Sequence, residues 1–333
     1  MSKTTFVKSS LTSAALLGGL ALAQPELTVY TYSSFVSDYG PGAQLTELFE
    51  AQCDCKLNWV SLEDGVSVLN RLRLEGERTQ ADLVLGFDNN LLAEARATGL
   101  LRPHGLDLDA LTVPGNWSAE LDVVPFDYGY FAFIYDQERL SNPPSSMAEL
   151  LASDLQVIYQ DPRSSTPGLG LLLWMKSIYG DQAEQAWQQM AARTLTVSSS
   201  WWDGYALYTE AKEGDLVLSY STSPAYHQVV EGTDQYQALH FAEGHFMQVE
   251  LAAITTASKQ PELAAQFLQM LISPEAQAVI PVTNWMLPVV AGAELPEAFD
   301  QLIQPEIVHQ LDPELVQQNR AAWVREWLTA SSR

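Results

Sequence analysis

The sequence predicts an α/β protein of two lobes, in which each lobe is a mostly parallel sheet flanked by helices and two crossover strands form the hinge. Apolar strand-like runs alternate with helix-like segments along most of the chain, which indicates repeated β-α units. A length of 333 residues favours two lobes over one. Two long apolar stretches, 123–136 and 246–254, stand where the chain would pass from the first lobe to the second and back. The predicted lobe I therefore comprises 24–125 and 246–333, and lobe II comprises 126–245.

Three strand–helix pairs open the first lobe. The expected strands are 27–32, 56–61 and 81–86, the expected helices are 44–52, 66–75 and 91–98, and helices 261–271 and 274–279 follow the return strand. Ligands of open parallel sheets bind outside the carboxyl ends of the strands. Tyr32 ends the first strand, and Asp64 and Gly65 follow the second. Asp64 also precedes a helix, so it is expected to act as an N-cap, a ligand contact or both.

The second lobe begins within 123–136, which has the pattern of a strand, a Pro-Phe-Asp break and a second strand. Its further expected strands are 157–160, 195–197 and 216–218, and its expected helices are 171–179 and 181–193. The loop 161–170 places hydroxyl groups, glycines and Arg163 before a helix N-terminus, with Ser165 among them. Such a loop suits a phosphate or carboxylate, although Pro and Gly also make ordinary turns. It is not a P-loop, because the Gly-Lys-Ser/Thr ending is absent.

Aromatic side chains follow several of these strands. The candidates for a binding site are Tyr220 and Tyr226 in 216–227 (LVLSYSTSPAYH), Trp201 and Trp202 after 195–197, and Trp285 in a predicted loop, 280–288. Aromatic faces with hydroxyl groups nearby suit a flat polar ligand. Each residue also has an ordinary interpretation as a packed ring or part of a strand end. Trp323 and Trp327, in a helix that starts at Asp312-Pro313, are assigned to the core by their helical spacing.

The N-terminus has the pattern of a cleavable secretory signal over 1–23. Lys3 and Lys8 precede an apolar run, 11–22, which is too short to span a bilayer and ends in Ala21-Leu22-Ala23. The mature chain is therefore expected to begin at Gln24. No cysteine follows the run closely enough to accept a lipid, so the sequence predicts a periplasmic protein that is neither a lipoprotein nor inserted in the membrane.

The net charge and the cysteine content restrict the classes of partner and ligand that the chain could bind. A formal net charge of −24 argues against nucleic acid as a partner and mildly favours a cationic ligand. Only two cysteines are present, Cys53 and Cys55. A local disulfide is the first interpretation for an oxidising compartment, and a free pair is the second. The spacing does not supply a metal site.

The chain resembles a known family, the thiamine-binding periplasmic proteins of ABC importers, which have the two-lobe periplasmic-binding-protein-like fold. The segments that carry the resemblance span nearly the whole mature chain: LTVYTYSSF, LEDGVSVLNRLRLEG, ADLVLGFDNNLL, VPFDYGYFAF, VIYQDPRSSTPGLGLLLWM, DLVLSYSTSPAYH, ASKQPELAAQFLQ, NWMLPV and REW. The resemblance implies a solute-binding protein, not an enzyme, that has no cofactor and carries thiamine or its mono- or diphosphate to a membrane permease and its ATPase.

The resemblance also implies a site between the lobes. The positions that match the family's ligand contacts are Tyr32, Asp64, Ser165, Trp201, Tyr220, Tyr226 and Trp285. The family has a single Trp where this chain has Trp201-Trp202. Thiamine has an aminopyrimidine and a cationic thiazolium, and aromatic faces suit both rings, with about 0.5–2 kcal/mol for a cation over a ring. Asp64 is expected to accept from the aminopyrimidine, and the loop with Ser165 to receive the hydroxyethyl or phosphate tail.

Two alternatives from other classes remain at this stage. A thiamine-degrading enzyme on the same fold would need a cysteine nucleophile, and only Cys53 and Cys55 are present. A ferric-ion binding protein would use tyrosines such as Tyr220 and Tyr226, but a clear set of His and carboxylate ligands is lacking. The nearest group is His240, His245 and Glu243, which are expected to lie in a loop.

Overall fold

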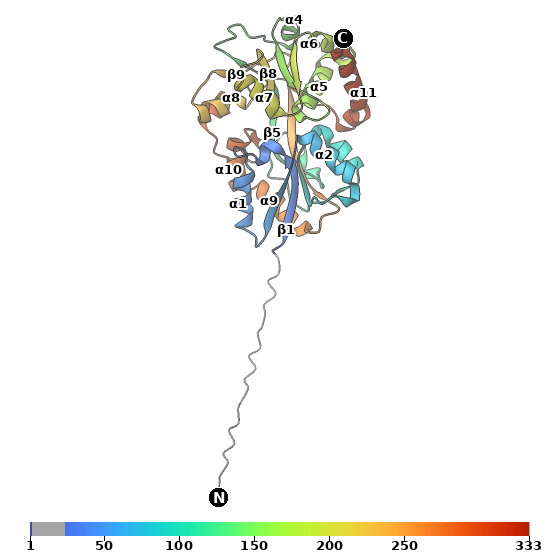
Figure 1. Ribbon diagram of the computed structural model, residues 1–333, viewed down its shortest axis with the longest axis vertical. Coiled ribbons are helices and arrows are strands. Elements are labelled where there is room, and N and C mark those ends of the chain that lie inside the picture. Colours follow the sequence, from blue (N-terminus) through green and yellow to red (C-terminus); the bar gives the residue numbers. More distant parts are fainter. Residues whose placement is uncertain (2–23, 333) are drawn as a thin grey trace.

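The computed structural model describes residue 1 and residues 24–332, and these form two lobes stacked along the long axis of the molecule (Figure 1). Residues 2–23 of the predicted signal, 1–23, lie outside the described residues. No helix in the described part of the chain is long and apolar enough to cross a membrane.

The sheet of the lower lobe in Figure 1 contains the three predicted parallel strands, β1 (Glu26–Tyr32), β2 (Lys56–Leu62) and β3 (Leu83–Asp88). Strand β1 lies between β2 and β3 and is parallel to both. The helices of this lobe are α1 (Gly42–Glu50), α2 (Gly65–Glu75), α3 (Leu92–Ala97), α9 (Pro261–Leu271) and α10 (Pro274–Thr283). The alternation predicted from apolar periodicity is confirmed here, with boundaries shifted by a few residues.

Two long strands run through both lobes. They are β5 (Val124–Asp136) and β10 (His245–Thr255), which are antiparallel neighbours at the centre of the sheet order β2-β1-β3-β10-β5-β8-β6-β7. The predicted break in 123–136 is wrong, because β5 is one continuous strand. Glu250 pairs with Asp127 and Leu251 pairs with Pro125, so Phe126 is an extra residue in a β-bulge. Proline is tolerated in a strand at such a bulge, which explains why Pro125 does not end β5.

The upper lobe continues the sheet from β5. Strand β8 (Leu216–Tyr220) is antiparallel to β5, and β6 (Val157–Gln160) is parallel to β8 and to β7 (Thr194–Ser198). The helices of this lobe are α4 (Met147–Ala152), α5 (Thr166–Tyr179), α6 (Ala183–Ala191), α7 (Trp201–Thr209), α8 (Ser223–Tyr226) and a π-helical turn, His227–Glu231. The short strands are β4 (Leu101–Arg102), β9 (Tyr236–Ala238), β11 (Leu287–Pro288) and β12 (Val308–His309).

Two predicted loops are shorter than expected. Helix α5 begins at Thr166 rather than 171, because Pro167 is compatible with a first helical turn. A Cβ atom at Gly170 would lie 1.9 Å from the Phe131 ring, so only glycine fits at this position of the helix. Helix α10 continues to Thr283 through Pro281, whose burial outweighs the backbone hydrogen bond that proline cannot make. Trp285 therefore follows a helix end almost directly.

The C-terminal helix α11 (Pro313–Ser331), dark red in Figure 1, packs against both lobes. Trp327 is buried, as predicted, and donates from Nε1 to the Tyr159 hydroxyl of β6 at 3.1 Å. Trp323 packs at the edge of the core and is only partly buried. On the other side Arg320 forms an ion pair with Glu94 of α3 at 3.0 Å. The predicted lobe boundaries stay a prediction, since α11 contacts both lobes.

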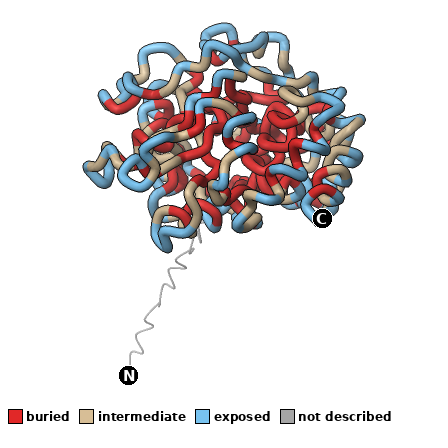
Figure 2. Tube along the Cα trace, turned by 90° about the horizontal axis from the view of Figure 1, so that it is seen from above, coloured by how far each residue is buried: buried red, intermediate tan, exposed pale blue. Residues whose placement is uncertain are grey.

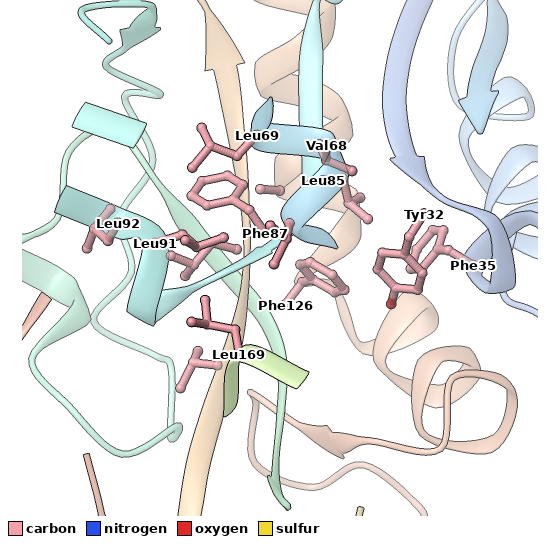
Figure 3. Close-up of a cluster of buried hydrophobic side chains, with 14 of the residues drawn as sticks. Tyr32, Phe35, Val68, Leu69, Leu85, Phe87, Leu91, Leu92, Phe126 and Leu169 are labelled. Carbon is pink, nitrogen blue, oxygen red and sulfur yellow. The ribbon is translucent and has the colours of Figure 1, made fainter. Parts of the chain in front are cut away.

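Buried residues gather in the interior of the molecule, while exposed residues lie around its outside (Figure 2). The core reaches the region between the lobes, where Tyr32 packs edge-on against Phe35 with 5.5 Å between ring centroids (Figure 3). Gly86 has a φ of +94°, and a Cβ atom there would lie 2.2 Å from the Tyr32 ring. Glycine is therefore required at residue 86 both for its backbone conformation and for the position of Tyr32.

Candidate functional site

A cavity between the lobes brings together most of the residues that the sequence singles out. Its lining includes seven of the nine predicted binding residues: Tyr32, Asp64, Trp201, Trp202, Tyr220, Tyr226 and Trp285. They come from β1, the start of α2, α7, β8, α8 and the segment after α10. The other two, Gly65 and Ser165, do not line the cavity but lie directly behind Asp64. The volume of about 100 Å³ is several times what one water molecule needs.

Asp64 occupies the point where three helices begin. Its Oδ1 accepts from the backbone N–H of Gly65 at 2.7 Å and of Thr166 at 3.0 Å. Its Oδ2 accepts from the Ser165 hydroxyl at 2.8 Å and from the backbone N–H of Trp201 at 3.2 Å. These donors belong to the N-termini of α2, α5 and α7, where helix dipoles favour a negative charge. Asp64 therefore caps its own helix, as one prediction has it, and also joins the lower lobe to the upper one.

Burial raises the pKa of Asp64 from its ordinary value, and the four hydrogen bonds oppose that shift. Gly65 allows the close approach of the helices. A Cβ atom at Gly65 would lie 2.1 Å from the carbonyl oxygen of Gly86 and 2.4 Å from the Thr166 hydroxyl. A larger residue at position 65 would push the two helix ends apart.

The two adjacent tryptophans have different environments. Trp201 stacks on Tyr205, with 5.1 Å between ring centroids, and donates from Nε1 to the Ser219 hydroxyl at 2.9 Å. Trp202 is 37% exposed and contacts the Tyr39 ring from the other lobe, with 5.2 Å between centroids. Both line the cavity, so Trp201 forms an inner wall and Trp202 lies at its edge.

Trp285 is held in an unusual backbone conformation, with a φ of +57°. Residues other than glycine rarely adopt this region, and bulky residues do so least often. Such backbone strain is concentrated at functional positions. The indole stacks on Phe299 and meets the Tyr226 ring edge-on, with 5.4 Å between the centroids of Trp285 and Tyr226. The backbone and both neighbouring rings therefore fix the position of this wall.

The floor of the cavity is formed by buried phenol and carboxyl groups. Tyr32 donates to Glu250 Oε2 at 2.7 Å, and Tyr220 donates to Gln248 Oε1 at 2.9 Å. Burial, together with nearby carboxylates, raises the pKa of both tyrosines well above the ordinary value. Both phenols are therefore neutral hydrogen-bond donors at neutral pH.

Ten further residues line the cavity: Ser34, Tyr39, Thr166, Pro167, Tyr205, Ser223, Glu250, Thr283, Asn284 and Met286. Thr166 and Pro167 belong to the predicted loop 161–170 and Ser223 to the stretch 216–227, whereas the other seven were not identified from the sequence. Glu250 carried a detectable signal, because it is the only charged residue between Phe246 and Thr255, in a strand whose other residues there are mostly apolar. A charge in the middle of a buried strand requires an explanation from its neighbours. Most of the others come from helix starts and loops, where no periodic pattern identifies the side chain that faces inward.

The histidines do not assemble a metal site. Among residue 1 and residues 24–332, no group of three or more His, Cys, Asp or Glu side chains could hold a metal ion. His245 is buried at the start of β10 rather than in a loop. Its Nε2 accepts a hydrogen bond from the backbone N–H of Phe241, and its Nδ1 is hydrogen-bonded to the carbonyl oxygen of Phe131. Glu243 accepts from the backbone N–H of Met147 and Ala148. His245 and Glu243 thus hydrogen-bond to different parts of the backbone, and His240 is exposed.

The two cysteines are joined. Cys53 and Cys55 form a disulfide with 5.3 Å between their Cα atoms, beside the start of β2. The described chain has no free cysteine. The first of the two interpretations of this pair agrees with the structure, and the thiol that a thiamine-degrading enzyme would need is not available in this state.

Comparisons with known proteins agree with this architecture. Residues 44–304 match the family model of the bacterial extracellular solute-binding proteins. This chain belongs to that family. The thiamine-binding periplasmic protein of Escherichia coli (strain K12) is 55% identical to it over 93% of this chain and 95% of that protein. The protein of the same name from Haemophilus influenzae is 43% identical over 99% of both chains.

Solved structures give the same result. A structure of a periplasmic thiamin binding protein superimposes on this solute-binding protein with a TM-score of 0.90 at 54% identity, over 93% of this chain and 97% of the other. A ferric binding protein from Campylobacter jejuni reaches a TM-score of 0.75 at 17% identity, over 91% and 99%, which shows a shared fold alone. The predicted two-lobe fold is confirmed. The relatives are binding proteins rather than enzymes, and this chain is a solute-binding protein of the same kind.

Proposed function

We propose that this solute-binding protein captures thiamine, and its phosphate esters, between its two lobes and delivers it to the membrane permease and ATPase of an ABC importer. The observation that carries the proposal is the cavity, whose lining includes seven of the nine residues predicted from the sequence. Relatives that are 43–55% identical over nearly the whole chain are named thiamine-binding periplasmic proteins.

The walls of the cavity suit the two rings of thiamine. Trp285 and Tyr226, which contact each other, and Trp201 all line the cavity and offer aromatic faces and edges. A cationic ring between such faces gains about 0.5–2 kcal/mol per contact. The carboxyl groups of Asp64 and Glu250 supply negative charge at the same cavity. An aromatic cation therefore fits these walls better than an anion or a neutral sugar.

We further propose that ligand binding and lobe closure are coupled through Asp64. Three of its four donors, from Ser165, Thr166 and Trp201, belong to the opposite lobe. These hydrogen bonds exist only when the lobes are closed, so a ligand that bridges the lobes and the Asp64 contacts favour the same state. The lobe boundaries that this implies are 24–125 with 246–333 for lobe I and 126–245 for lobe II.

The export prediction belongs to the same proposal. A signal over 1–23 would be removed, and the mature protein from Gln24 would work in the periplasm without a lipid anchor. The disulfide between Cys53 and Cys55 suits that oxidising compartment.

Thermal unfolding of the mature protein, 24–333, tests the proposed ligand. Thiamine, thiamine monophosphate and thiamine diphosphate would each be added in turn, with nicotinamide at the same concentration as the control. At one hundred times the dissociation constant a ligand adds about 2.7 kcal/mol to the free energy of unfolding, so a clear rise in melting temperature is expected. The absence of a rise with every form of thiamine would contradict the proposal.

A further inference from the structure

Three acidic side chains stand in one row across the centre of the sheet. Glu250 of β10 is the register partner of Asp88 of β3 on one side and of Asp127 of β5 on the other. Asp88 and Asp127 are 0% exposed and Glu250 is 5% exposed. Like charges directly opposite one another destabilise a sheet, and burial increases that cost. Because such a row of buried carboxyl groups is costly, we ask what function it serves on the two crossover strands.

No cation of the described chain compensates Asp127 or Glu250, since neither forms an ion pair. Their hydrogen-bond donors are neutral side chains. Glu250 accepts from Tyr32 at 2.7 Å and from Gln248 at 3.0 Å, and Asp127 Oδ2 accepts from Asn284 Nδ2 at 2.7 Å. Two adjacent carboxylates with these partners alone could not both stay ionised in the free protein.

One oxygen of the pair lacks a donor. Among the residues that the structure describes, Asp127 Oδ1 is fully buried and has no hydrogen-bond partner. Its cross-strand neighbour is the Glu250 carboxyl group, which also lines the cavity. A proton held by the pair would supply the missing donor. Burial raises the pKa of Asp127 to about 8, and burial together with the charge of Asp127 raises the pKa of Glu250 well above its ordinary value, in agreement with a bound proton.

We infer that the Asp127–Glu250 pair holds a proton in the free protein and releases it to solvent when a ligand with a fixed positive charge enters the cavity. The inference rests on the proposed function and names the counter-ion that the ligand's cation would use. The carboxyl O–H bond breaks and the proton goes to solvent, so the pair, which carries one negative charge while it holds the proton, carries two when it faces the cation. No other bond changes.

The groups that face the pair from the surrounding elements do not supply this charge. Tyr32 of β1 and Tyr220 of β8 remain neutral, because their pKa values are raised well above the ordinary value. Asp64 is already held by its four donors. Burial raises the pKa of Asp88 to about 6, and this group accepts from Asn90 and Leu91. Arg320 lowers the pKa of Asp88, but it forms its ion pair with Glu94.

Proton release gives ligand affinity a characteristic pH dependence. The free protein binds more protons than the complex, so thiamine affinity should rise with pH, by up to about tenfold per pH unit for one proton released. An uncharged isostere, in which carbon replaces the thiazolium nitrogen, should bind with the pair still protonated. Its affinity should not rise with pH.

Calorimetry counts the protons directly in the unmodified mature protein. Thiamine would be titrated at pH 7.0 in HEPES and in Tris, whose ionisation enthalpies differ, and the difference in binding heat gives the number of protons released. The expected number is clearly above zero and no more than one. Glu250→Gln should reduce it to near zero. The matched control is Glu63→Gln, which removes an exposed carboxyl group next to Asp64 and should leave proton release unchanged.

Each outcome separates the two proposals. Binding with proton release in the wild type and in Glu63→Gln, but without release in Glu250→Gln or with the uncharged isostere, supports the inference. Thiamine binding without proton release in the wild type overturns the inference and leaves the proposed function intact. Equal release in Glu250→Gln also overturns it. Absence of thiamine binding to the wild type overturns the proposed function itself.

Discussion

Two groups of buried carboxyls at the same cavity have opposite environments. Asp64 accepts four hydrogen bonds, three of them from backbone N–H groups at helix N-termini. Asp127 and Glu250 face each other on the crossover strands and receive hydrogen bonds only from neutral side chains. Asp64 is 7% exposed and Glu250 is 5% exposed, so burial does not distinguish them.

The comparison shows that the donors around a carboxyl group, rather than its depth, decide which task it can perform. Oriented N–H groups from both lobes make Asp64 an ionised contact that favours closure. The Asp127–Glu250 pair has excess negative charge and too few donors, so it stores a proton and responds to a cation. Asp64 thus holds the two lobes together, whereas the Asp127–Glu250 pair interacts with the ligand.

The largest effect is expected from Asp64→Asn. The amide would present its own N–H groups to donors from α5 and α7, so the closed state should lose about 2–3 kcal/mol. Thiamine affinity should fall by about 30- to 100-fold, measured by calorimetry, and scattering should show a more open molecule at equal ligand concentration. Asp203→Asn, an exposed carboxyl group on α7, is the control. Equal affinity in both variants would mean that Asp64 has no part in closure.

Removal of a cavity wall should have the next largest effect. Trp285→Ala deletes an aromatic face held by Tyr226 and Phe299, and should weaken binding of all three thiamine forms alike, by about 2 kcal/mol. Trp323→Ala, on α11 and away from the cavity, should leave affinity unchanged in the folded protein. A Trp285→Ala protein that melts earlier but binds normally would assign this tryptophan to packing.

The stability of the free protein should depend on pH through Glu250. Its pKa is raised in the folded state, so the folded protein binds more protons than the unfolded chain above about pH 4 and loses stability as pH rises. Glu250→Gln lacks this loss, so its free energy of unfolding should increase relative to that of the wild type between pH 5 and pH 8. Denaturant unfolding at both pH values measures the difference. Parallel pH dependence in the two proteins would contradict a protonated pair.

Ser165→Ala is expected to have the smallest effect. Loss of its hydrogen bond to Asp64 should cost about 1 kcal/mol, and its place at the start of α5 predicts a larger loss for the phosphate esters than for thiamine. Calorimetry with the three ligands checks this order. An equal loss for all three would show that Ser165 acts only through Asp64.

Much of the fold follows from local patterns in the sequence. Apolar periodicity located β6 and α9 to the residue, and the strand ends identified Tyr32 and Asp64 as neighbours of a site. The boundaries between loops and helices were harder to predict, because Pro167 and Pro281 resemble residues that end a helix and yet lie inside helices. Local propensity does not include the tertiary contacts that outweigh it there.

The candidate site was predicted less completely than the fold. Aromatic residues near strand ends were found because large rings and hydroxyl groups are conspicuous in sequence. The Asp127–Glu250 pair was missed because the two residues are more than 120 positions apart and meet only through the register of β5 and β10. The bulge at Phe126, which sets that register, was signalled only by Pro125, which the sequence analysis interpreted as a break between two strands.

A crystal structure of the mature protein with thiamine would show whether the ligand binds between the lobes. We expect closed lobes, the two rings of thiamine between Trp201, Tyr226 and Trp285, and the thiazolium on the side of Glu250. Asp64 should keep its hydrogen bonds to Thr166 and Trp201. Thiamine bound outside this cavity, or a cationic ring that faces away from Glu250 and Asp127, would rule out the proposed site.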